Sequence, residues 1–372
     1  MRVAVLKEIL EGEKRVAAVP ATVEKMVGAG MEVLVEVGAG LASGFADPEY
    51  LAAGAKVEDR PQALLADGDV VVKVQRPSEA ELDRIPDRAL LVAYTLQARG
   101  ESWLAENWKR RRISALSLDL LPRIARAQSM DVLSSMANIA GYKSVLLVAN
   151  ALARFFPMLM TAAGTVLPAR VFVLGAGVAG LQAIATARRL GAVVSGFDIR
   201  PAVKEQVESL GARFVAVGLD ERAEDAKGYA REVSAEAARK QRELLVEELK
   251  TTDACVTTAL IPGKRAPTLI TAAMVEAMRP GSVIVDLAAE QGGNCELTEP
   301  GKEIVSHGVR ILGPQNLVST MAFQASQLYS RNVLNFLLHL YDRQARKITL
   351  DPADEIVKGC LIAHAGEVLQ PV

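Results

Sequence analysis

The chain has 372 residues, of which 50% are hydrophobic, 23% charged and 4% aromatic, and its formal net charge is −1. This composition is typical of a globular protein and excludes an intrinsically disordered chain. The near-zero charge gives no general attraction for nucleic acid or for an acidic membrane surface, and the length predicts two domains.

The first third of the chain alternates short apolar strands with helical stretches. Strands are predicted over residues 2–7, 31–37, 70–74 and 89–94, and a helix ending in glycine is predicted over residues 20–30. Strands separated by helices of ten or more residues are typical of βαβ units. This part of the chain therefore predicts a parallel sheet.

A long helical pattern over residues 129–156 follows, and we place a domain boundary within it, after residue 140. The apolar run 145–169 is a candidate membrane span, but Arg154 and Pro157 interrupt it. The uninterrupted stretches are shorter than the ~20 apolar residues that a spanning helix needs. We therefore expect a buried helix followed by a glycine-containing loop, and a soluble protein.

A second alternation of strands and helices begins at residue 170. Between two of its strands, residues 219–250 are rich in charge and helical only in their second half, so the first half is predicted to be a lid. After residue 317 the pattern is helical over 322–341, with no sheet of its own, and we expect this segment to pack on the first domain. The strands predicted in this part are 170–174, 193–198, 213–217, 253–258, 282–287 and 309–312, with a helix over 179–190.

The predicted fold class is therefore α/β, with two Rossmann-like domains that contain parallel sheets and are joined by long helices. The first domain is residues 1–140 completed by 318–372, and the second is the nucleotide-binding domain, residues 141–317.

The strongest motif is G-x-G-x-x-G at Gly175, Gly177 and Gly180, directly after an apolar strand and before a helix. The first glycine permits a tight turn, the second the close approach of a pyrophosphate, and the third a close contact between helix and strand. The helix that follows offers unpaired N–H groups and its positive dipole end to the phosphates. Val178, which precedes the predicted helix, and Ala179, which begins it, are also predicted to bind the cofactor.

An acid, Asp198, ends the next predicted strand about 20 residues further on, where such a residue binds the adenine ribose. A carboxylate there repels a 2′-phosphate, so NAD(H) is the predicted cofactor. Ile199 and Arg200 complete the predicted contacts, although Arg200 could also receive a 2′-phosphate.

Candidate acid–base residues are scarce. A dehydrogenase moves a proton as well as a hydride and most often uses a histidine to do so. The three histidines, His307, His339 and His364, all lie beyond residue 300, and none follows a strand of the first domain. Transfer between two nicotinamides needs only positioning and exclusion of water, which suits this chain better. Cys255, Cys295 and Cys360 lack metal-ligand spacing, so we expect no metal site and a cytoplasmic location.

The run 122–142, PRIARAQSMDVLSSMANIAGY, resembles the signature of the NAD(H)-binding domain of proton-translocating nicotinamide nucleotide transhydrogenase. Similar likenesses occur at TTALIPGKRAPTLIT, VIVDLAAEQGGNCELTEPGK and ASQLYSRNVLNFL, so that nearly the whole chain is covered. The resemblance implies that the first run lies beside the nicotinamide. Its implied working residues are Arg123, Gln128, Asp131 and Ser134.

The resemblance further implies a mobile loop that closes over bound nucleotide through a tyrosine in a Gly-Tyr-Ala context, which is Tyr229 here. It implies a homodimer that binds NADH, from which hydride passes directly to NADP⁺ held on a partner subunit. Membrane-spanning and NADP(H)-binding subunits would be separate chains, and this chain would lie on the inner face of the cell membrane. No nucleic-acid partner is expected.

Two other hypotheses are open. The alanine dehydrogenase family is a distant relative with the same two-domain plan, and Arg15 and Lys73 match positions where that family holds its substrate. Its Tyr-Leu-His, however, is Tyr94-Thr95-Leu96 here, so the histidine is missing. The other hypothesis is a nucleotide-sensing module that binds NAD(H) and regulates a partner without catalysis.

Overall fold

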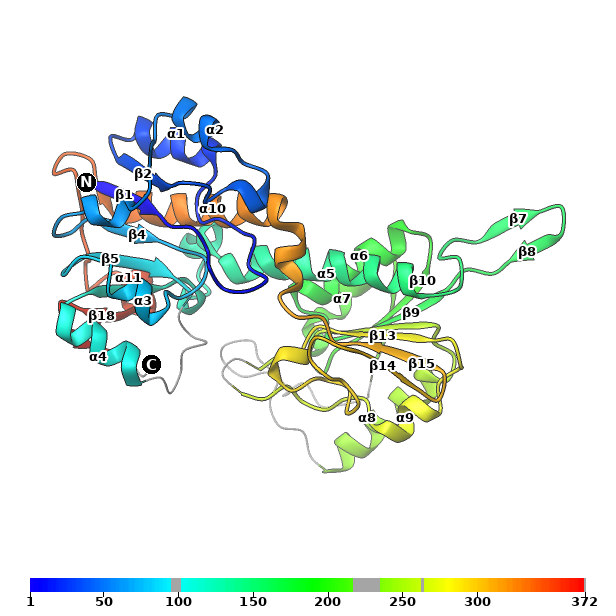
Figure 1. Ribbon diagram of the computed structural model, residues 1–372. Coiled ribbons are helices and arrows are strands. Elements are labelled where there is room, and N and C mark those ends of the chain that lie inside the picture. The colour runs from blue at the N-terminus through cyan, green and yellow to red at the C-terminus, as the bar shows by residue number, and fades with distance from the viewer. Residues whose placement is uncertain (95–101, 217–234, 262–263, 371–372) are drawn as a thin grey trace. The chain divides into compact units, whose positions relative to one another are not determined.

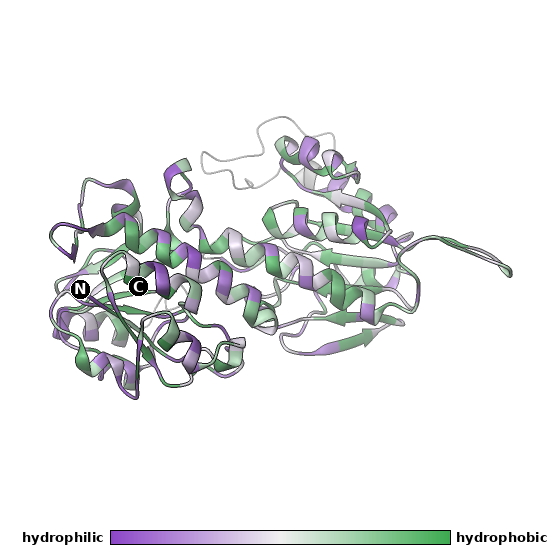
Figure 2. Cartoon of the chain, turned by 90° about the horizontal axis from the view of Figure 1, so that it is seen from above, coloured by the Kyte–Doolittle hydropathy of each residue, from purple (hydrophilic) through white to green (hydrophobic). Residues whose placement is uncertain are grey.

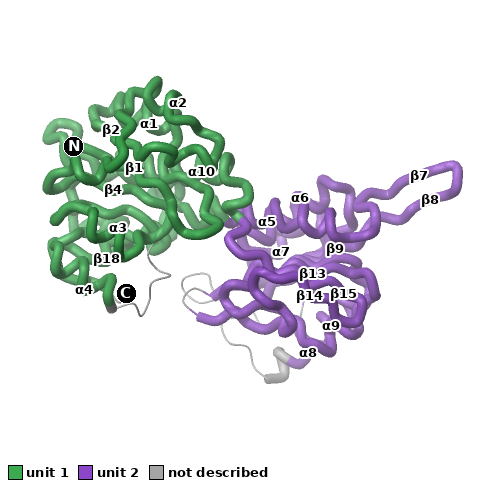
Figure 3. The backbone as a smooth tube through the Cα atoms, viewed as in Figure 1, with its two compact units in different colours: residues 1–136, 318–372 green, residues 137–317 purple. Residues whose placement is uncertain are grey.

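The computed structural model describes residues 1–94, 102–216, 235–261 and 264–370. The chain forms two compact units, unit 1 (Met1–Met136 with Val318–Val372) and unit 2 (Ala137–Leu317), drawn in different colours in Figure 3. Each unit contains one large sheet flanked by helices (Figure 1), which confirms the predicted α/β class with two Rossmann-like domains.

Unit 1 is built on an eight-stranded sheet, within the described residues, in the order β19-β18-β6-β5-β4-β1-β2-β3. The six strands from the first third of the chain run parallel, and the two C-terminal strands are antiparallel additions at one edge. The strands are β1 (Arg2–Val5), β2 (Glu32–Glu36), β3 (Lys56–Glu58), β4 (Val70–Val72), β5 (Leu90–Ala93), β6 (Ser114–Ser117), β18 (Leu361–His364) and β19 (Glu367–Val368).

One prediction for the C-terminal segment is wrong. The sequence predicts no sheet there, yet β18 and β19 extend the first sheet and β16 (Tyr341–Asp342) pairs with β17 (Lys347–Ile348) as a separate hairpin. These strands are two to four residues long, too short to produce a recognisable alternation of apolar and polar residues. The helices of unit 1 are α1 (Pro20–Gly28), α2 (Asp47–Ala52), α3 (Glu79–Leu82), α4 (Ser102–Arg111), α10 (Ala322–Leu340) and α11 (Glu355–Cys360).

Unit 2 has a seven-stranded sheet, within the described residues, in the order β11-β10-β9-β12-β13-β15-β14. All neighbours are parallel except β14, which pairs antiparallel with β15. The first strand of this sheet in chain order, β9, lies near its centre. The next two strands, β10 and β11, follow on one side of β9, and β12 pairs with β9 on the other side. The strands are β9 (Arg170–Leu174), β10 (Val193–Phe197), β11 (Arg213–Val215), β12 (Ala254–Thr257), β13 (Val283–Asp286), β14 (Glu303–Ser306) and β15 (Val309–Leu312).

Successive residues of each central strand in unit 2 serve two different cores. Val171 and Val173 of β9 face a cluster that includes α5 and α6, whereas Phe172 and Leu174 face a cluster with α8 and α9. The strands are accordingly rich in hydrophobic residues (Figure 2), as expected when both faces of a parallel sheet are covered. The helices are α5 (Val132–Ala151), α6 (Val178–Arg189), α7 (Lys204–Ser209), α8 (Ala235–Leu249) and α9 (Ala272–Glu276).

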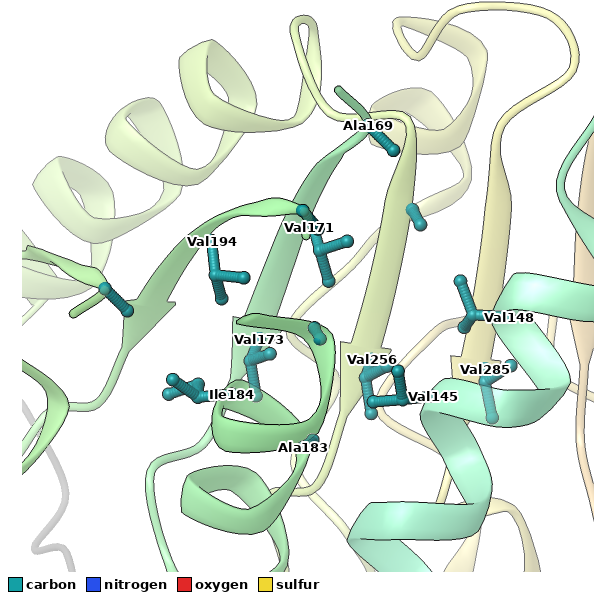
Figure 4. Packing of buried hydrophobic residues seen from close by; sticks show 14 of the residues in the cluster. Val145, Val148, Ala169, Val171, Val173, Ala183, Ile184, Val194, Val256 and Val285 are labelled. Atoms are coloured by element: carbon teal, nitrogen blue, oxygen red, sulfur yellow. The ribbon is translucent and has the colours of Figure 1, made fainter. Parts of the chain in front are cut away.

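Helix α5 is the one helix, among the described residues, that is long and apolar enough by composition to cross a membrane, and 39% of its most apolar window is buried. Its C-terminal half packs on the sheet of unit 2. Figure 4 shows Val145 and Val148 pointing toward Val256 and Val285 of the neighbouring strands. This packing accounts for the apolar side chains on that face of the helix.

After α5, the expected glycine-containing loop is a β-hairpin instead. β7 (Leu159–Thr161) pairs antiparallel with β8 (Gly164–Val166), and the hairpin extends away from the rest of unit 2 (Figure 1). Met160 and Leu167 are 81% and 78% exposed. The apolar residues that suggested a membrane span are thus divided between the core helix and an exposed hairpin.

Candidate nucleotide-binding site

The turn between β9 and α6 is shaped by its three glycines, and each has a different steric role. A Cβ added at Gly175, where φ is +96°, would lie 2.6 Å from the hydroxyl of Thr258, and one added at Gly180 would lie 1.8 Å from the carbonyl oxygen of Gly175. At both positions a side chain would clash with neighbouring atoms of the chain. A Cβ at Gly177 meets nothing within 4 Å, so this position faces open space.

The N-terminal end of α6 is held in place from two sides. Gly141 lies within α5 at a close approach to α6, because a Cβ there would come within 2.1 Å of the carbonyl oxygen of Ala179. On the other side, the amide of Ala176 donates to Oδ2 of Asp198 at 2.8 Å. Val178, the first residue of the helix, is 39% exposed beside the open position. The first turn of α6 therefore presents its N–H groups to the space that Gly177 leaves free.

Asp198, at the end of β10, is engaged by Arg200. The guanidinium Nε donates to Oδ1 and Nη2 to Oδ2, each at 2.9 Å, and the amide of Arg200 also donates to Oδ1 at 2.9 Å. The sequence alone allows Arg200 to bind a 2′-phosphate. In the structure the guanidinium forms a bidentate salt bridge with the carboxylate of Asp198. Such a pair is stronger than a single hydrogen bond between neutral groups.

A hollow lies beside this pair. Its wall combines the end of β10 with β11 and the turn between them, and Ile199 is part of it. The lining combines one carboxylate, Asp198, and one ammonium, Lys204, with apolar side chains. This mixture suits an adenosine group, whose ribose is polar and whose base is flat and apolar on its faces. The lining residues are Phe197, Asp198, Ile199, Pro201, Lys204, Phe214 and Ala216.

The glycine turn, the helix N-terminus and this hollow follow neighbouring strands at the carboxyl edge of the sheet, where the strand order reverses between β9 and β12. Open α/β sheets bind nucleotides at this topological position, and the residues present fit a dinucleotide. The fold and the turn together define a dinucleotide-binding protein of the Rossmann class.

The chain belongs to the alanine dehydrogenase/PNT family: the N-terminal domain model of that family matches residues 4–140 and the C-terminal domain model matches residues 144–371. An NAD(P) transhydrogenase subunit alpha protein of Rhodospirillum rubrum is 50% identical over 378 aligned residues, covering 100% of this chain and 98% of that protein. The crystal structure of transhydrogenase from Sinorhizobium meliloti is 45% identical, with a TM-score of 0.90 and coverage of 99% and 100%. Alanine dehydrogenase of Halomonas elongata is 30% identical, covering 99% and 94%.

These similarities confirm the family resemblance seen in the sequence, with alanine dehydrogenase as the more distant relative.

The predicted nicotinamide-side residues belong to unit 1. Arg123 and Gln128 are exposed, and Gln128 stands in a short 3₁₀ helix, η5 (Ala125–Met130), between the buried Ala127 and Met130. The side chain of Gln128 thus projects from a turn that is anchored by its apolar neighbours.

Asp131 and Ser134 bond to each other at the start of α5. Oδ1 of Asp131 accepts from the amide of Ser134 at 2.9 Å, and Oδ2 accepts from the hydroxyl of Ser134 at 2.5 Å. This is the arrangement of a helix N-cap, which satisfies an otherwise unpaired amide of the first turn. The pair therefore has a local structural role besides the predicted one. Tyr229, the remaining predicted contact, lies outside the described residues, as does the segment around it.

Unit 1 also contains a buried cluster of charges that the sequence did not reveal. Arg15 is 5% exposed, and its Nε and Nη2 donate to the two carboxylate oxygens of Glu13 at 2.8 and 2.6 Å. Burial by itself raises the pKa of Glu13, but the hydrogen bonds and charge of Arg15 outweigh it and hold this pKa at about 2. The pair is separated by only one residue, and no spacing rule predicts its burial.

Lys73, 1% exposed, is the second centre of this cluster. Its Nζ lies 2.5 Å from Oε1 of Glu81 and 3.6 Å from Oε2 of Glu8. Burial raises the pKa of Glu8 to about 7, opposed by the positive charge of Lys73 and by a hydrogen bond from the amide of Val74. Arg15 and Lys73, the two cations that the resemblance to alanine dehydrogenase singles out, are thus each engaged by carboxylates of the chain itself.

The three histidines have local partners or lie in turns. His339 Nε2 is 2.6 Å from Oδ2 of Asp354, His364 Nδ1 is 3.1 Å from the hydroxyl of Ser114, and His307 occupies an exposed turn with φ of +50°. His307 and His339 are thus exposed residues, whereas His364 is the last residue of β18 and belongs to the sheet of unit 1, which the sequence does not predict.

Proposed function

We propose that this chain is the NAD(H)-binding subunit of a proton-translocating nicotinamide nucleotide transhydrogenase, and that it passes hydride from NADH to NADP⁺ bound on a partner subunit. The observation that supports nucleotide binding is the open space beside Gly177, whereas a side chain at Gly175 or Gly180 would clash with the chain. The choice of transhydrogenase rests on 50% identity to an alpha subunit over the whole chain.

The roles of the residues follow from their chemistry. The glycine turn and the first turn of α6 hold the pyrophosphate, while Asp198 binds the adenine ribose and, with its negative charge, discriminates against a 2′-phosphate. Arg123, Gln128, Asp131 and Ser134 orient the carboxamide and ribose of the nicotinamide end. Bound NADH supplies the hydride, and the chain supplies position and exclusion of water. Tyr229 serves the closure over the nucleotide.

The partners in this proposal are a second copy of the chain, an NADP(H)-binding subunit and a membrane-spanning subunit. The chain acts in the cytoplasm, held at the inner face of the membrane through those subunits. Support for the homodimer comes from the β7–β8 hairpin, where Phe155, Met158, Met160 and Leu167 are between 56% and 81% exposed. Met160 lies on the hairpin and the other three lie in the segments that lead into and out of it, and exposed apolar side chains grouped in this way are typical of an interface.

An alanine-dehydrogenase-like activity is the second candidate, favoured by the buried carboxyl of Glu8, which lies 3.6 Å from Nζ of Lys73 and whose pKa is raised by burial to about 7. Against it, the Arg15 guanidinium uses Nε and Nη2 on Glu13, and Lys73 is held by Glu81 and Glu8. A substrate carboxylate would have to compete with these groups.

The test is to mix the purified chain with an NADP(H)-binding domain and follow reduction of an acetylpyridine analogue of NAD⁺ by NADPH. We expect a rate far above that of either protein alone. A mixture no faster than its components would reject the proposal, and NADH formation from alanine by the chain alone would establish the second candidate.

A further inference from the structure

The carbonyl oxygen of Ser129, the residue after Gln128, receives two side-chain hydrogen bonds from helix α10. Nδ2 of Asn332 donates to it at 2.9 Å and Nδ2 of Asn335 at 3.0 Å. A carbonyl oxygen has two lone pairs, so both of its acceptor positions are used. The two asparagines are three positions apart and therefore lie on the same face of the helix.

Helix α10 provides a firm base for these two bonds. Eleven of its 19 residues are buried, and the hydroxyl of Tyr329 donates to the carbonyl of Lys73 at 2.8 Å. The turn is also held at its other end, where Nη2 of Arg126 lies 3.5 Å from Oδ1 of Asp354 at the start of α11. The exposed residue Gln128 thus stands between two attachments of the turn to the C-terminal segment.

The side chain of Gln128 makes no hydrogen bond to any described residue, and its direction therefore depends on the backbone that carries it. We propose that Asn332 and Asn335 are positioning residues for hydride transfer, which fix the backbone of residues 128–130 and through it the amide of Gln128. This inference rests on the proposed function, because it assumes that Gln128 acts at the nicotinamide end.

The two bonds restrict the conformational freedom of the turn. An exposed 3₁₀ turn without such bonds samples several backbone conformations, and a shift of about 1 Å in a positioning group can slow a reaction strongly. Asn332 is 6% exposed and its Oδ1 is buried without a hydrogen-bond partner. The side-chain amide of Asn332 is therefore oriented by the carbonyl of Ser129: its Nδ2 donates to the turn, while its Oδ1 is left without a hydrogen bond.

The test uses Asn335→Asp, because Asn335 is only partly buried and the substitution keeps its shape while replacing the donor by an acceptor. We expect the transfer rate in the presence of the NADP(H)-binding domain to fall about fivefold or more, with NADH affinity changed less than about twofold. Amide hydrogen exchange of residues 125–131 should accelerate, while exchange in α6 stays unchanged. Gln324→Ala, an exposed amide on the same helix, is the matched control and should change none of these.

A double-variant comparison separates positioning from general structural support. In a Gln128→Asn background, Asn335→Asp should have less than about a twofold further effect, because its action passes through Gln128. Unaltered transfer or exchange in Asn335→Asp, or effects that multiply in the double variant, would overturn the positioning role alone. Lack of transfer by the unaltered chain would overturn the proposed function and this role with it. Asn335→Ala serves as a second variant if Asn335→Asp does not fold.

Discussion

Thr258 donates its side-chain hydroxyl to the carbonyl oxygen of Gly175 at 3.0 Å, across the ends of the neighbouring strands β12 and β9. The amide of the same threonine donates to the carbonyl of Leu174 at 2.8 Å. These bonds hold the glycine turn closed from the side of β12, at the point where the strand order reverses. Hydrogen bonds of the chain itself therefore fix the turn in which Gly177 stands.

Gly177→Ala should weaken NADH binding without weakening the fold. The added methyl group meets no protein atom within 4 Å, but it enters the space assigned to the pyrophosphate. We expect NADH affinity to fall about tenfold or more, with little change in Tm. Gly28→Ala is the control, since Gly28 in α1 also has open space around a Cβ, and it should leave NADH affinity unaltered. Undiminished affinity in Gly177→Ala would place the phosphates elsewhere.

Asp198→Asn should reduce the preference for NADH over NADPH. The substitution removes the negative charge that opposes a 2′-phosphate and weakens the hold on Arg200. The ratio of the NADPH to the NADH dissociation constant should fall about tenfold or more, since hydrogen bonds to charged groups are worth about 1.5–3 kcal/mol. Arg200→Ala removes the nearby cation instead of the carboxylate, so it should bring no gain in NADPH affinity. An unchanged ratio in Asp198→Asn would count against its role in specificity.

Gln128→Asn should slow hydride transfer far more than it weakens NADH binding. The shorter side chain withdraws the amide by about one methylene, and misplacement on this scale can cost about 100-fold in rate. Stopped-flow transfer with the NADP(H)-binding domain and NADH titration would measure the two quantities separately. Gln324→Asn on α10 makes the same chemical change at an exposed position and should have no effect. Equal losses of rate and affinity would withdraw the positioning role.

Glu8→Gln should change how stability depends on pH. The pKa of Glu8 is raised from 4.5 to about 7 in the folded chain, chiefly by burial. Stability from the protonated carboxyl is therefore fully present below the unfolded value and is lost as pH rises through about 7. Glutamine keeps the neutral form at all pH values and can still accept from Val74. The Tm of the variant relative to the unaltered chain should rise by about 2 °C or more between about pH 5 and pH 8.

Leu167→Glu should disrupt the proposed homodimer. Leu167 is 78% exposed beside the β7–β8 hairpin, so a charge costs nothing in the isolated chain but is buried at an interface. Sedimentation velocity should show a monomer at concentrations where the unaltered chain is a dimer. Val305→Glu, which changes a residue 65% exposed on β14, is the control. A dimer that survives the change at Leu167 would move the interface away from the hairpin.

The second half of the Rossmann fold can be predicted closely because its signals are local. The strand β9 has its observed bounds in the prediction, and α6 differs by one residue at each end, since an apolar strand and a glycine turn mark their own limits. Short strands with few apolar residues, such as β6 and β19, escape prediction. The hairpin of β7 and β8 is predicted as a loop because its exposed strands show no alternation tied to a buried face.

The candidate site shows the same division between local and long-range information. Gly175, Gly177 and Gly180 are predictable because their pattern is confined to a few neighbouring positions. The bonds from Asn332 and Asn335 to Ser129 span more than 200 residues of sequence, and no pattern in the chain indicates them. The pairing of Lys73 with Glu8 also joins segments that are far apart in sequence, and no local pattern indicates it.

The central claim is that hydrogen passes directly between two nicotinamide nucleotides without a proton-handling group of the chain. The most direct measurement uses NADH deuterated at the transferred position of C4, NADP⁺ and the NADP(H)-binding domain, with mass analysis of the NADPH formed. Direct hydride transfer predicts one deuterium atom in each NADPH formed, and no deuterium at that position when unlabelled NADH is used in D₂O. Solvent-derived hydrogen at the transferred position would contradict the claim.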